Sequence, residues 1–253
     1  MEGSVTTTVA DGIGIIEFYS SKGNSLPGSL LKDLTENITN AGTDDNISVI
    51  ILKSKGEGAF CAGASFSELM TIDSEESGTK FFMGFANVIL AMRSCPKLII
   101  VKVQGKAVGG GVGIAAAGDF CFAHENASIK LSELTLGIGP FVIAPAVERK
   151  IGISAFSTLT IQASKWQTAD WAFSKGLYNS VLNSHAELDQ EINTLANELS
   201  GYSIEAMRDI KTMLWGATDH YDSLLKERAA ISGRLAQSSF TKDFIKQFNS
   251  KSI

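Results

Sequence analysis

The residues most suited to chemistry in this chain are three consecutive glycines, Gly109 to Gly111, within Q-G-K-A-V-G-G-G-V-G-I-A-A-A-G-D at 104–119. An aliphatic run, Leu98 to Val103, leads into them, and small apolar residues follow. This order predicts a strand, a turn of bare glycine backbone and a short helix. Peptide N–H groups at a helix start can hold a phosphate or a developing oxyanion. The segment therefore indicates an anion-handling site.

The elements that must position these glycines alternate between strand and helix patterns. A two-strand hairpin is expected to turn at Ala10-Asp11-Gly12, and a polar surface loop is expected at Ile72–Ser77. Strands are expected at Val5–Val9, Ile13–Phe18, Val49–Ser54, Leu98–Val103, Asp119–Ala123 and Ser128–Leu131. Helices are expected at Ser29–Ala41, Ser65–Met70 (capped by Ser65), Thr79–Met92, Trp166–Lys175, Leu188–Leu199, Ile204–Trp215, Tyr221–Ala236 and Thr241–Phe248, so helix dominates from Ile143 onward.

Composition narrows the class of protein. The chain has 253 residues, 44% hydrophobic and 19% charged, which predicts one large soluble domain or one domain with a helical appendage. A net charge of −5 without basic clusters argues against nucleic acid and membrane-surface partners. No apolar run is long enough for a bilayer, and the N-terminal segment does not read as a signal or transit peptide. Three cysteines form neither a metal spacing nor an even disulfide framework, so we expect no metal site and a cytoplasmic location.

Two segments of the sequence share one physical layout. The first is N-I-S-V-I-I-L-K-S-K-G-E-G-A-F-C-A-G-A-S at 46–65, and the second is K-L-I-I-V-K-V-Q-G-K-A-V-G-G-G-V-G-I at 97–114. Each predicts a buried strand, a loop with lysine and glycine, and a glycine–alanine turn into a helix. Two such turns at neighbouring strand ends would aim two N–H groups at one point.

Dinucleotide binding is a rival explanation of the glycines. The segment from Gly111 fits G-x-G-x-x-A, and Glu133 lies 22 residues further on. However, the gap between Val103 and Gly111 is long, whereas that fingerprint follows its strand directly. The helix also ends at Gly118 after about two turns, too short for a crossover helix, which makes an oxyanion site the favoured reading.

Four segments carry a family resemblance: A-F-C-A-G-A-S at 59–65, the glycine segment at 105–119, S-E-L-T-L-G-I at 132–138 and A-D-W-A-F-S-K-G-L-Y at 169–178. In order and spacing they resemble the enoyl-CoA hydratase/isomerase (crotonase) family over nearly the whole chain. The resemblance implies an α/β superhelix of repeated β-β-α units with a C-terminal helical region. It implies a core with the acyl-CoA site over 1–190, a helical trimerisation region over 191–253, and a homotrimer or homohexamer.

The resemblance also implies the ligand and its contacts. The substrate is an acyl-CoA thioester, and no separate cofactor is expected because coenzyme A is part of the substrate. The oxyanion hole would consist of the backbone N–H groups of Ala64 and Gly110. Substrate contacts would come from Ala62, Gly109 and Phe141. The CoA phosphates would meet lysine, either Lys55 or a C-terminal lysine of a neighbouring subunit.

Carboxylates decide the reaction that the resemblance implies. Family members use up to two glutamates; the position of the first is Gly113 here, whereas the second is kept as Glu133. Adding water across a double bond favours two carboxylates, whereas moving the bond from the β,γ to the α,β position needs one. The segment G-I-G-P-F-V-I, with Phe141 and Val142, also resembles mitochondrial-type Δ3,Δ2-enoyl-CoA isomerases more than hydratases. We therefore expect an isomerase with Glu133 as its acid and base.

Other readings remain open at this stage. Glu68 is a candidate second acid, which would suit hydration of a branched substrate such as methylglutaconyl-CoA. Decarboxylation of a β-carboxy acyl-CoA needs only enolate stabilisation, and a non-catalytic acyl-CoA binding protein is a reading of another class. Ser65 stands where the family commonly has aspartate, and Asp119 is expected to fix backbone or a partner subunit. Apolar C-terminal residues (Phe240, Phe244 and Phe248) would cap the acyl or CoA pocket or fill the core.

Overall fold

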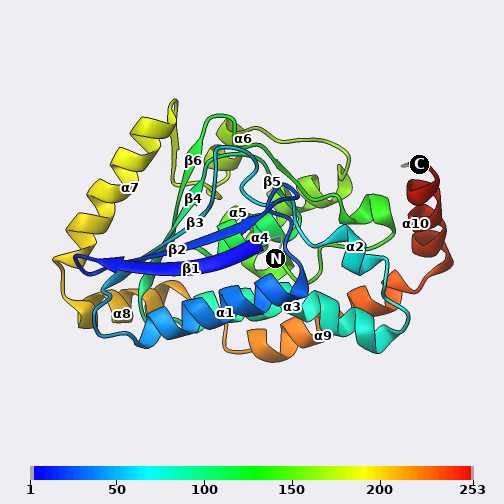
Figure 1. Ribbon diagram of the computed structural model, residues 1–253, viewed down its shortest axis with the longest axis horizontal. Helices are drawn as coiled ribbons and strands as arrows, with labels where there is room; N and C mark the ends of the chain where they lie inside the picture. Colours follow the sequence, from blue (N-terminus) through cyan, green and yellow to red (C-terminus); the bar gives the residue numbers. More distant parts are fainter. Residues whose placement is uncertain (1–2, 252–253) are drawn as a thin grey trace.

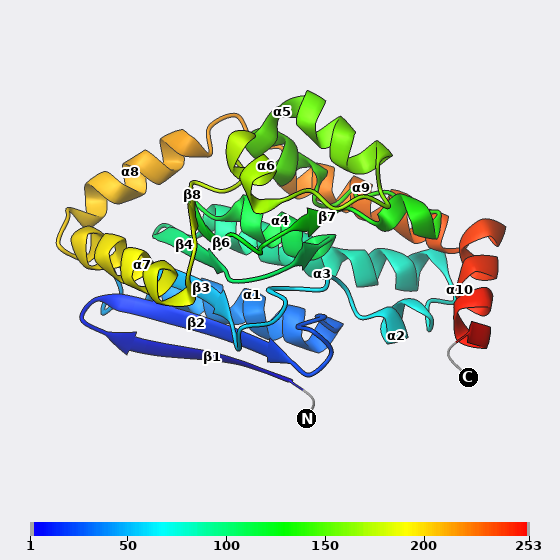
Figure 2. The ribbon, with the colours of Figure 1, turned by 90° about the horizontal axis from the view of Figure 1, so that it is seen from above.

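A six-stranded sheet organises the fold of the computed structural model, which describes residues 3–251 and the side chains of residues 3–247. Its order is β1 (Gly3–Ala10), β2 (Ile13–Ser20), β3 (Val49–Ser54), β4 (Leu98–Val103), β6 (Phe120–His124) and β8 (Ser180–Leu182) (Figure 2). β1 and β2 are antiparallel and the other pairs parallel. Asp11 and Gly12 have φ of 50° and 79°, which suits the tight hairpin turn that the sequence predicts.

Helices cover both faces of this sheet (Figure 1). In β3, Ile50 and Leu52 pack in the core on the side of α1 and α3, whereas Val49 and Ile51 pack against α7. Because side chains alternate along a strand and both faces are buried, the strand reads as one apolar run. The helices are α1 (Gly28–Thr43), α2 (Phe66–Leu69), α3 (Glu75–Ser94), α4 (Gly110–Ala117), α5 (Ala144–Ile161), α6 (Ala169–Ser174), α7 (His185–Ser200), α8 (Ile204–Leu214), α9 (Tyr221–Ala236) and α10 (Ser239–Lys251).

A small second sheet lies beside the glycine turns. It pairs β5 (Ala107–Val108) with β7 (Ile129–Lys130) in parallel, and the 3₁₀ helix η1 (Glu133–Leu136) follows β7. This order brings the segment with Glu133 next to the glycine turn, because β5 leads directly into Gly109.

The C-terminal helices are fixed to the sheet by a buried polar cluster. Asp119 accepts hydrogen bonds from the backbone N–H of Ile99 (2.8 Å) and the Trp215 Nε1 (3.0 Å). Its carboxylate also pairs with Lys211 Nζ of α8 at 2.9 Å. Asp119 therefore fixes backbone, as the sequence suggested, and ties α8 to β4. None of the helices within residues 3–251 is long and apolar enough to cross a bilayer.

Most expected elements are present, with a few corrections. The two-residue strand β5 was not predicted, and the helix expected from Trp166 begins at Ala169. The loop expected at Ile72–Ser77 is too long, because α3 begins at Glu75, where Ser74 and Ser77 form a capping box. The strand β8 was not predicted, since its three residues form no recognisable run. The expected α/β class and the helical C-terminal region are confirmed; the division at residue 190 stays a prediction.

Candidate active site

The first glycine–alanine turn lies between β3 and α2. Its backbone is held by two hydrogen bonds to Leu26: Leu26 N–H donates to Gly63 O (2.8 Å), and Ser65 N–H donates to Leu26 O (3.1 Å). Gly63 has φ of 89°, a conformation that L side chains rarely adopt. Between these two bonds, the N–H of Ala64 donates to no acceptor among the described residues. It is therefore available to a ligand.

The second turn ends at the start of α4. Gly109 caps this helix with φ of 52° and ψ of −117°, and its N–H donates to Lys130 O at 2.9 Å. Gly110 is the first helical residue, and its N–H finds no acceptor within the described part of the chain. A helix N-terminus carries a partial positive charge, so this donor favours a negatively charged oxygen.

The two turns lie side by side. Val108 N–H donates to Cys61 O at 2.9 Å, and Cys61 forms a parallel bridge with Ala107. A Cβ on Gly63 would lie 3.1 Å from Val108 O and 3.9 Å from the N of Gly110, so the two turns are in close contact. The sequence expectation of two neighbouring turns therefore matches their positions.

Both turns open into one apolar cavity of about 290 Å³. The structure brings Ala62, Ala64, Gly109, Gly110, Glu133 and Phe141, six of the seven expected site residues, into its lining. The remaining wall is mostly apolar: Phe66, Leu69, Phe81, Phe82, Phe85, Val108, Leu136, Ile138, Pro140, Val142, Ile143 and Phe244, together with Gly63, Gly139, Ser132 and Ser232. Such a wall suits a hydrocarbon chain and keeps the local polarity low.

Glu133 is the one titratable side chain among the described residues that line this cavity. Its Oε2 is buried and has no hydrogen-bond partner among the described residues. Burial raises the pKa of Glu133 to about 7, because an apolar wall disfavours the charged form. A Cβ on Gly109 would lie only 2.7 Å from Oε1, so the glycine also makes room for this carboxylate.

No side chain fits at Gly113, the position at which the family resemblance places a first glutamate. A Cβ on Gly113 would lie 2.4 Å from Ile143 Cγ2 and 3.5 Å from Ile89 Cδ1. Two isoleucines thus occupy the space that a side chain at 113 would need. A second carboxylate does not reach the cavity from this helix.

Glu68, the expected candidate second acid, does not line the acyl cavity. Its Oε2 instead accepts a hydrogen bond from the N–H of Gly28 at 2.8 Å. Gly28 is the first residue of α1, so Glu68 satisfies a free donor at a helix start. The sequence placed Glu68 four residues after Ala64 but gave no direction for its side chain.

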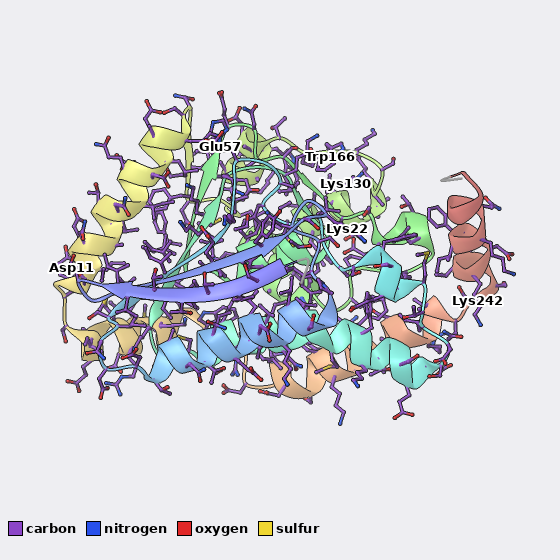
Figure 3. The ribbon with its side chains drawn as sticks, in the orientation of Figure 1. Asp11, Lys22, Glu57, Lys130, Trp166 and Lys242 are labelled. Carbon is purple, nitrogen blue, oxygen red and sulfur yellow. The ribbon has the colours of Figure 1, made fainter. Side chains whose placement is uncertain are left out.

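A basic and aromatic group beside the two turns was missed by sequence reasoning. Lys106 and Lys130 place their Nζ atoms 5.1 Å and 4.6 Å from the centre of the Trp166 ring. Figure 3 labels Lys130 and Trp166. Their backbones hydrogen-bond next to cavity residues, since Lys106 O accepts from Cys61 and Lys130 O from Gly109. The Nζ of Lys55, an expected phosphate ligand, lies 5.8 Å from the centre of the Tyr19 ring, and its phosphate contact stays a prediction. No local pattern indicates this group, because its residues come from separate segments that the pairing of β5 with β7 brings together.

The C-terminal phenylalanines differ in position. Phe244 of α10 lines the cavity, whereas Phe240 is 62% exposed. The side chain of Phe248 lies outside the described residues. The α9 residue Ser232 also reaches the cavity. Part of the wall therefore comes from the chain's own last helices.

Comparison with known proteins supports the family resemblance of the sequence. The sequence model of the enoyl-CoA hydratase/isomerase family matches residues 8–251. A probable enoyl-CoA hydratase of Bacillus subtilis is 25% identical over 250 residues, 98% of this chain and 96% of its own length. A peroxisomal Delta(3,5)-Delta(2,4)-dienoyl-CoA isomerase of Arabidopsis thaliana is 25% identical over 206 residues, 76% of this chain and 72% of its own.

Solved structures agree on the fold. The crystal structure of an enoyl-CoA hydratase from Bacillus halodurans superposes with a TM-score of 0.90 at 21% identity, covering 96% of this chain and 99% of that one. Some longer curated relatives match over only about half or a third of their own length. Because the family match spans almost the whole sequence, this chain belongs to the enoyl-CoA hydratase/isomerase family.

Proposed function

We propose that the protein is an acyl-CoA double-bond isomerase that uses Glu133 as its sole acid and base. The observation that carries the proposal is the pairing of one buried carboxylate with two unpaired N–H groups, at Ala64 and Gly110, in one apolar cavity. The substrate is a β,γ-unsaturated acyl-CoA thioester. Coenzyme A enters as part of that substrate, so no separate cofactor is needed.

The proposed reaction moves one proton and one double bond. The Glu133 carboxylate removes a proton from the α-carbon, and the electrons of that C–H bond delocalise onto the thioester oxygen as a dienolate. The N–H groups of Ala64 and Gly110 stabilise the oxygen's negative charge, a contribution worth about 10²–10³-fold per donor. The protonated Glu133 then returns the proton to the γ-carbon, which leaves the α,β double bond and the original carboxylate.

The pKa of Glu133 suits both halves of this cycle. At a pKa of about 7, much of the carboxylate is ionised at neutral pH, and its conjugate acid still gives up a proton readily. Phe141, Val142 and Ile143 form an apolar wall beside it. That wall disfavours an ordered water, which supports isomerisation over hydration.

We also propose where coenzyme A meets the surface. Lys106 and Lys130, with the partly exposed Trp166, form a cationic and aromatic surface beside the two turns that line the cavity. Phosphate groups favour such cations, and a purine favours a stacking surface. A charge-reversed variant, Lys130→Glu, should raise KM for acyl-CoA with a smaller effect on kcat.

Replacement of Glu133 by glutamine tests the reaction. With a 3-enoyl-CoA substrate, the wild-type protein should produce the conjugated 2-enoyl thioester, followed by its absorbance. Glu133→Gln should lose at least about 10³-fold in kcat while retaining acyl-CoA binding, because it removes the proton carrier and keeps the shape. Full turnover by the variant would exclude Glu133 from the mechanism.

Hydration of an enoyl-CoA is the second candidate, favoured by the names of several relatives. Crotonyl-CoA separates the two reactions, since rapid addition of water by the wild-type protein would overturn the isomerase proposal. The variant Glu68→Gln adds a second arm. It should leave isomerisation unchanged and reduce activity only if Glu68 holds a water, which its bond to Gly28 disfavours.

We further propose a homotrimer or homohexamer in the cytoplasm. Large apolar side chains are exposed on α5 (Ile153 and Ile161), α6 (Phe173) and α8 (Met213). Exposed apolar side chains on several elements suit contact with other copies of the chain. Sedimentation analysis should give a mass of three or six chains, and a monomer at micromolar concentration would contradict the proposal.

A further inference from the structure

The acyl cavity runs along the N-terminal half of α3. The ring of Phe85 lies against the second donor, since a Cβ on Gly110 would be 2.2 Å from Phe85 Cε1. Phe81 and Phe82 also line the cavity, about one helical turn earlier. Phe85 therefore marks the reacting end, and Phe81 and Phe82 belong to the part of the wall further from it.

A second hollow lies behind this wall, and we name it the α1–α3 groove. It has a volume of about 620 Å³ and is lined by Gly28, Leu31, Lys32, Thr35, Glu36, Glu68, Thr71, Ile72, Ser77, Lys80, Phe81, Gly84 and Asn87. Among the described residues, Phe81 alone lines both the acyl cavity and this groove. Its ring is the shared wall between the two spaces.

The groove offers two large apolar side chains besides that ring, Leu31 and Ile72. Ile72, in the groove, packs in the same apolar cluster as Phe81, Phe82 and the cavity residue Phe66. Leu31 adds a second apolar surface. The charged side chains of the groove are the exposed Lys32, Glu36 and Lys80, and the half-buried Glu68, whose carboxylate accepts from the N–H of Gly28. A methyl-terminated chain entering past Phe81 would therefore meet hydrocarbon first.

We propose that Phe81 sets the upper length limit of the acyl chain, and that the α1–α3 groove accepts the tail of a longer straight-chain acyl-CoA once this ring is removed. The inference rests on the proposed function, because it takes the cavity to hold the acyl group. A cavity of about 290 Å³ has room for roughly ten groups of ~30 Å³ each. Chains beyond roughly ten carbons therefore need the space behind Phe81.

Phe82 provides a matched control on the same helix. The two rings pack edge to face, with centroids 5.1 Å apart and planes at 87°. Phe82 lines the acyl cavity but not the groove, and it also packs against the main core. Phe82→Ala therefore enlarges the cavity without connecting it to the groove, whereas Phe81→Ala connects the two.

Calorimetric dissociation constants of saturated acyl-CoAs, from about eight to about sixteen carbons, test the proposal without turnover. Wild-type affinity should stop rising near ten carbons. In Phe81→Ala it should continue to rise by about threefold per added methylene, so that the longest chain binds at least tenfold more tightly than to wild type. Phe82→Ala should move the limit by only about two or three carbons, consistent with the volume of one ring.

A blocking variant completes the experiment. Thr35 lies on α1 and lines the groove but not the acyl cavity. Thr35→Trp in the Phe81→Ala background should therefore fill the groove and restore the wild-type length limit. An unchanged length profile in Phe81→Ala, or an equal extension in Phe82→Ala, would overturn the role of Phe81 while leaving the proposed function intact. If no acyl-CoA of any length binds, the proposed function itself fails and this inference fails with it.

Discussion

The two glycine–alanine turns look alike in sequence and present their N–H groups in different ways. In the first, Ala64 lies in extended chain between two backbone bonds to Leu26, and the helix that follows has only four residues. In the second, Gly110 is the first residue of an eight-residue helix that is almost entirely buried. The first donor is thus fixed by pairing to neighbouring chain, and the second by a helix N-terminus.

The second turn also positions more of the site than the first. Gly109 lies directly against the Glu133 carboxylate and hydrogen-bonds to Lys130, two residues before Ser132. Glu133 is the one carboxylate among the described cavity residues, and its contact is with Gly109 of the second turn. The difference teaches that one turn positions a donor alone, whereas the other positions a donor and the catalytic group together.

The largest effect is expected from Gly109→Ala. The new methyl group would lie 2.7 Å from Glu133 Oε1, and the φ of 52° with ψ of −117° strains any residue other than glycine. We expect kcat/KM to fall about 10³-fold or more, because the proton carrier is displaced. Gly63→Ala, whose methyl group would lie 3.1 Å from Val108 O, should lose less.

Gly56→Ala separates strain from displacement. Gly56 has φ of 87°, but a Cβ there meets nothing within 4 Å. This variant should lose stability and keep its kcat/KM. If Gly63→Ala proves more damaging than Gly109→Ala, the two turns do not divide their roles as described.

Amide-to-ester replacement tests the two donors individually. Lactic acid in place of Ala64, or glycolic acid in place of Gly110, removes one N–H without adding a side chain. Each should reduce kcat by about 10²–10³-fold. The larger loss is expected at Gly110, whose N–H acts together with the helix dipole. Single-turnover kinetics measure the effect, and equal KM values exclude lost binding; an unchanged kcat at either position would remove that donor from the oxyanion hole.

Much of the fold could be predicted from the sequence because its central strands are buried on both faces. Val49–Ser54 and Leu98–Val103 were predicted with the bounds of β3 and β4, since each begins with four consecutive aliphatic residues. The start of α3 was missed because its cap, Ser74, lies in a polar stretch that reads as loop. β8 was missed because three residues give no periodicity.

The site was predictable as far as its residues are local in sequence. The two turns and Glu133 each follow a short motif, and the structure places them around one cavity. Lys106, Lys130 and Trp166 come from three separate segments, so only the pairing of β5 with β7 brings them together. The space behind Gly113 is filled by Ile143, 30 residues away, which no local pattern reveals.

The buried carboxylate should make stability depend on pH. Glu133 has a pKa of about 7 in the folded protein, whereas an unfolded glutamate titrates at about 4.3. Between these values the folded state binds more protons, so its free energy of unfolding falls as pH rises. Glu133→Gln should therefore match the wild-type protein near pH 4 and be more stable by about 3 kcal/mol near pH 8.

Urea unfolding of both proteins across this range measures the difference. A difference that does not change with pH would show that Glu133 is not desolvated. Glu17→Gln is a control, because Glu17 does not line the acyl cavity. Its side chain is partly exposed and forms an ion pair with Lys53 at 3.1 Å.

The smallest effect concerns the cap that only the first turn has. Ser65 Oγ accepts a hydrogen bond from the N–H of Glu68 at 3.4 Å, and α4 has no side-chain counterpart. Ser65→Ala should lower the free energy of unfolding by about 1 kcal/mol and change kcat/KM by no more than about threefold. Ser65→Asp should retain the stability, because aspartate caps helices as well as serine does. A different outcome is a loss of more than about tenfold in kcat/KM in Ser65→Ala that Ser65→Asp restores. That result would show that the cap holds Ala64 in place. The four-residue helix would then position the first donor as α4 positions the second.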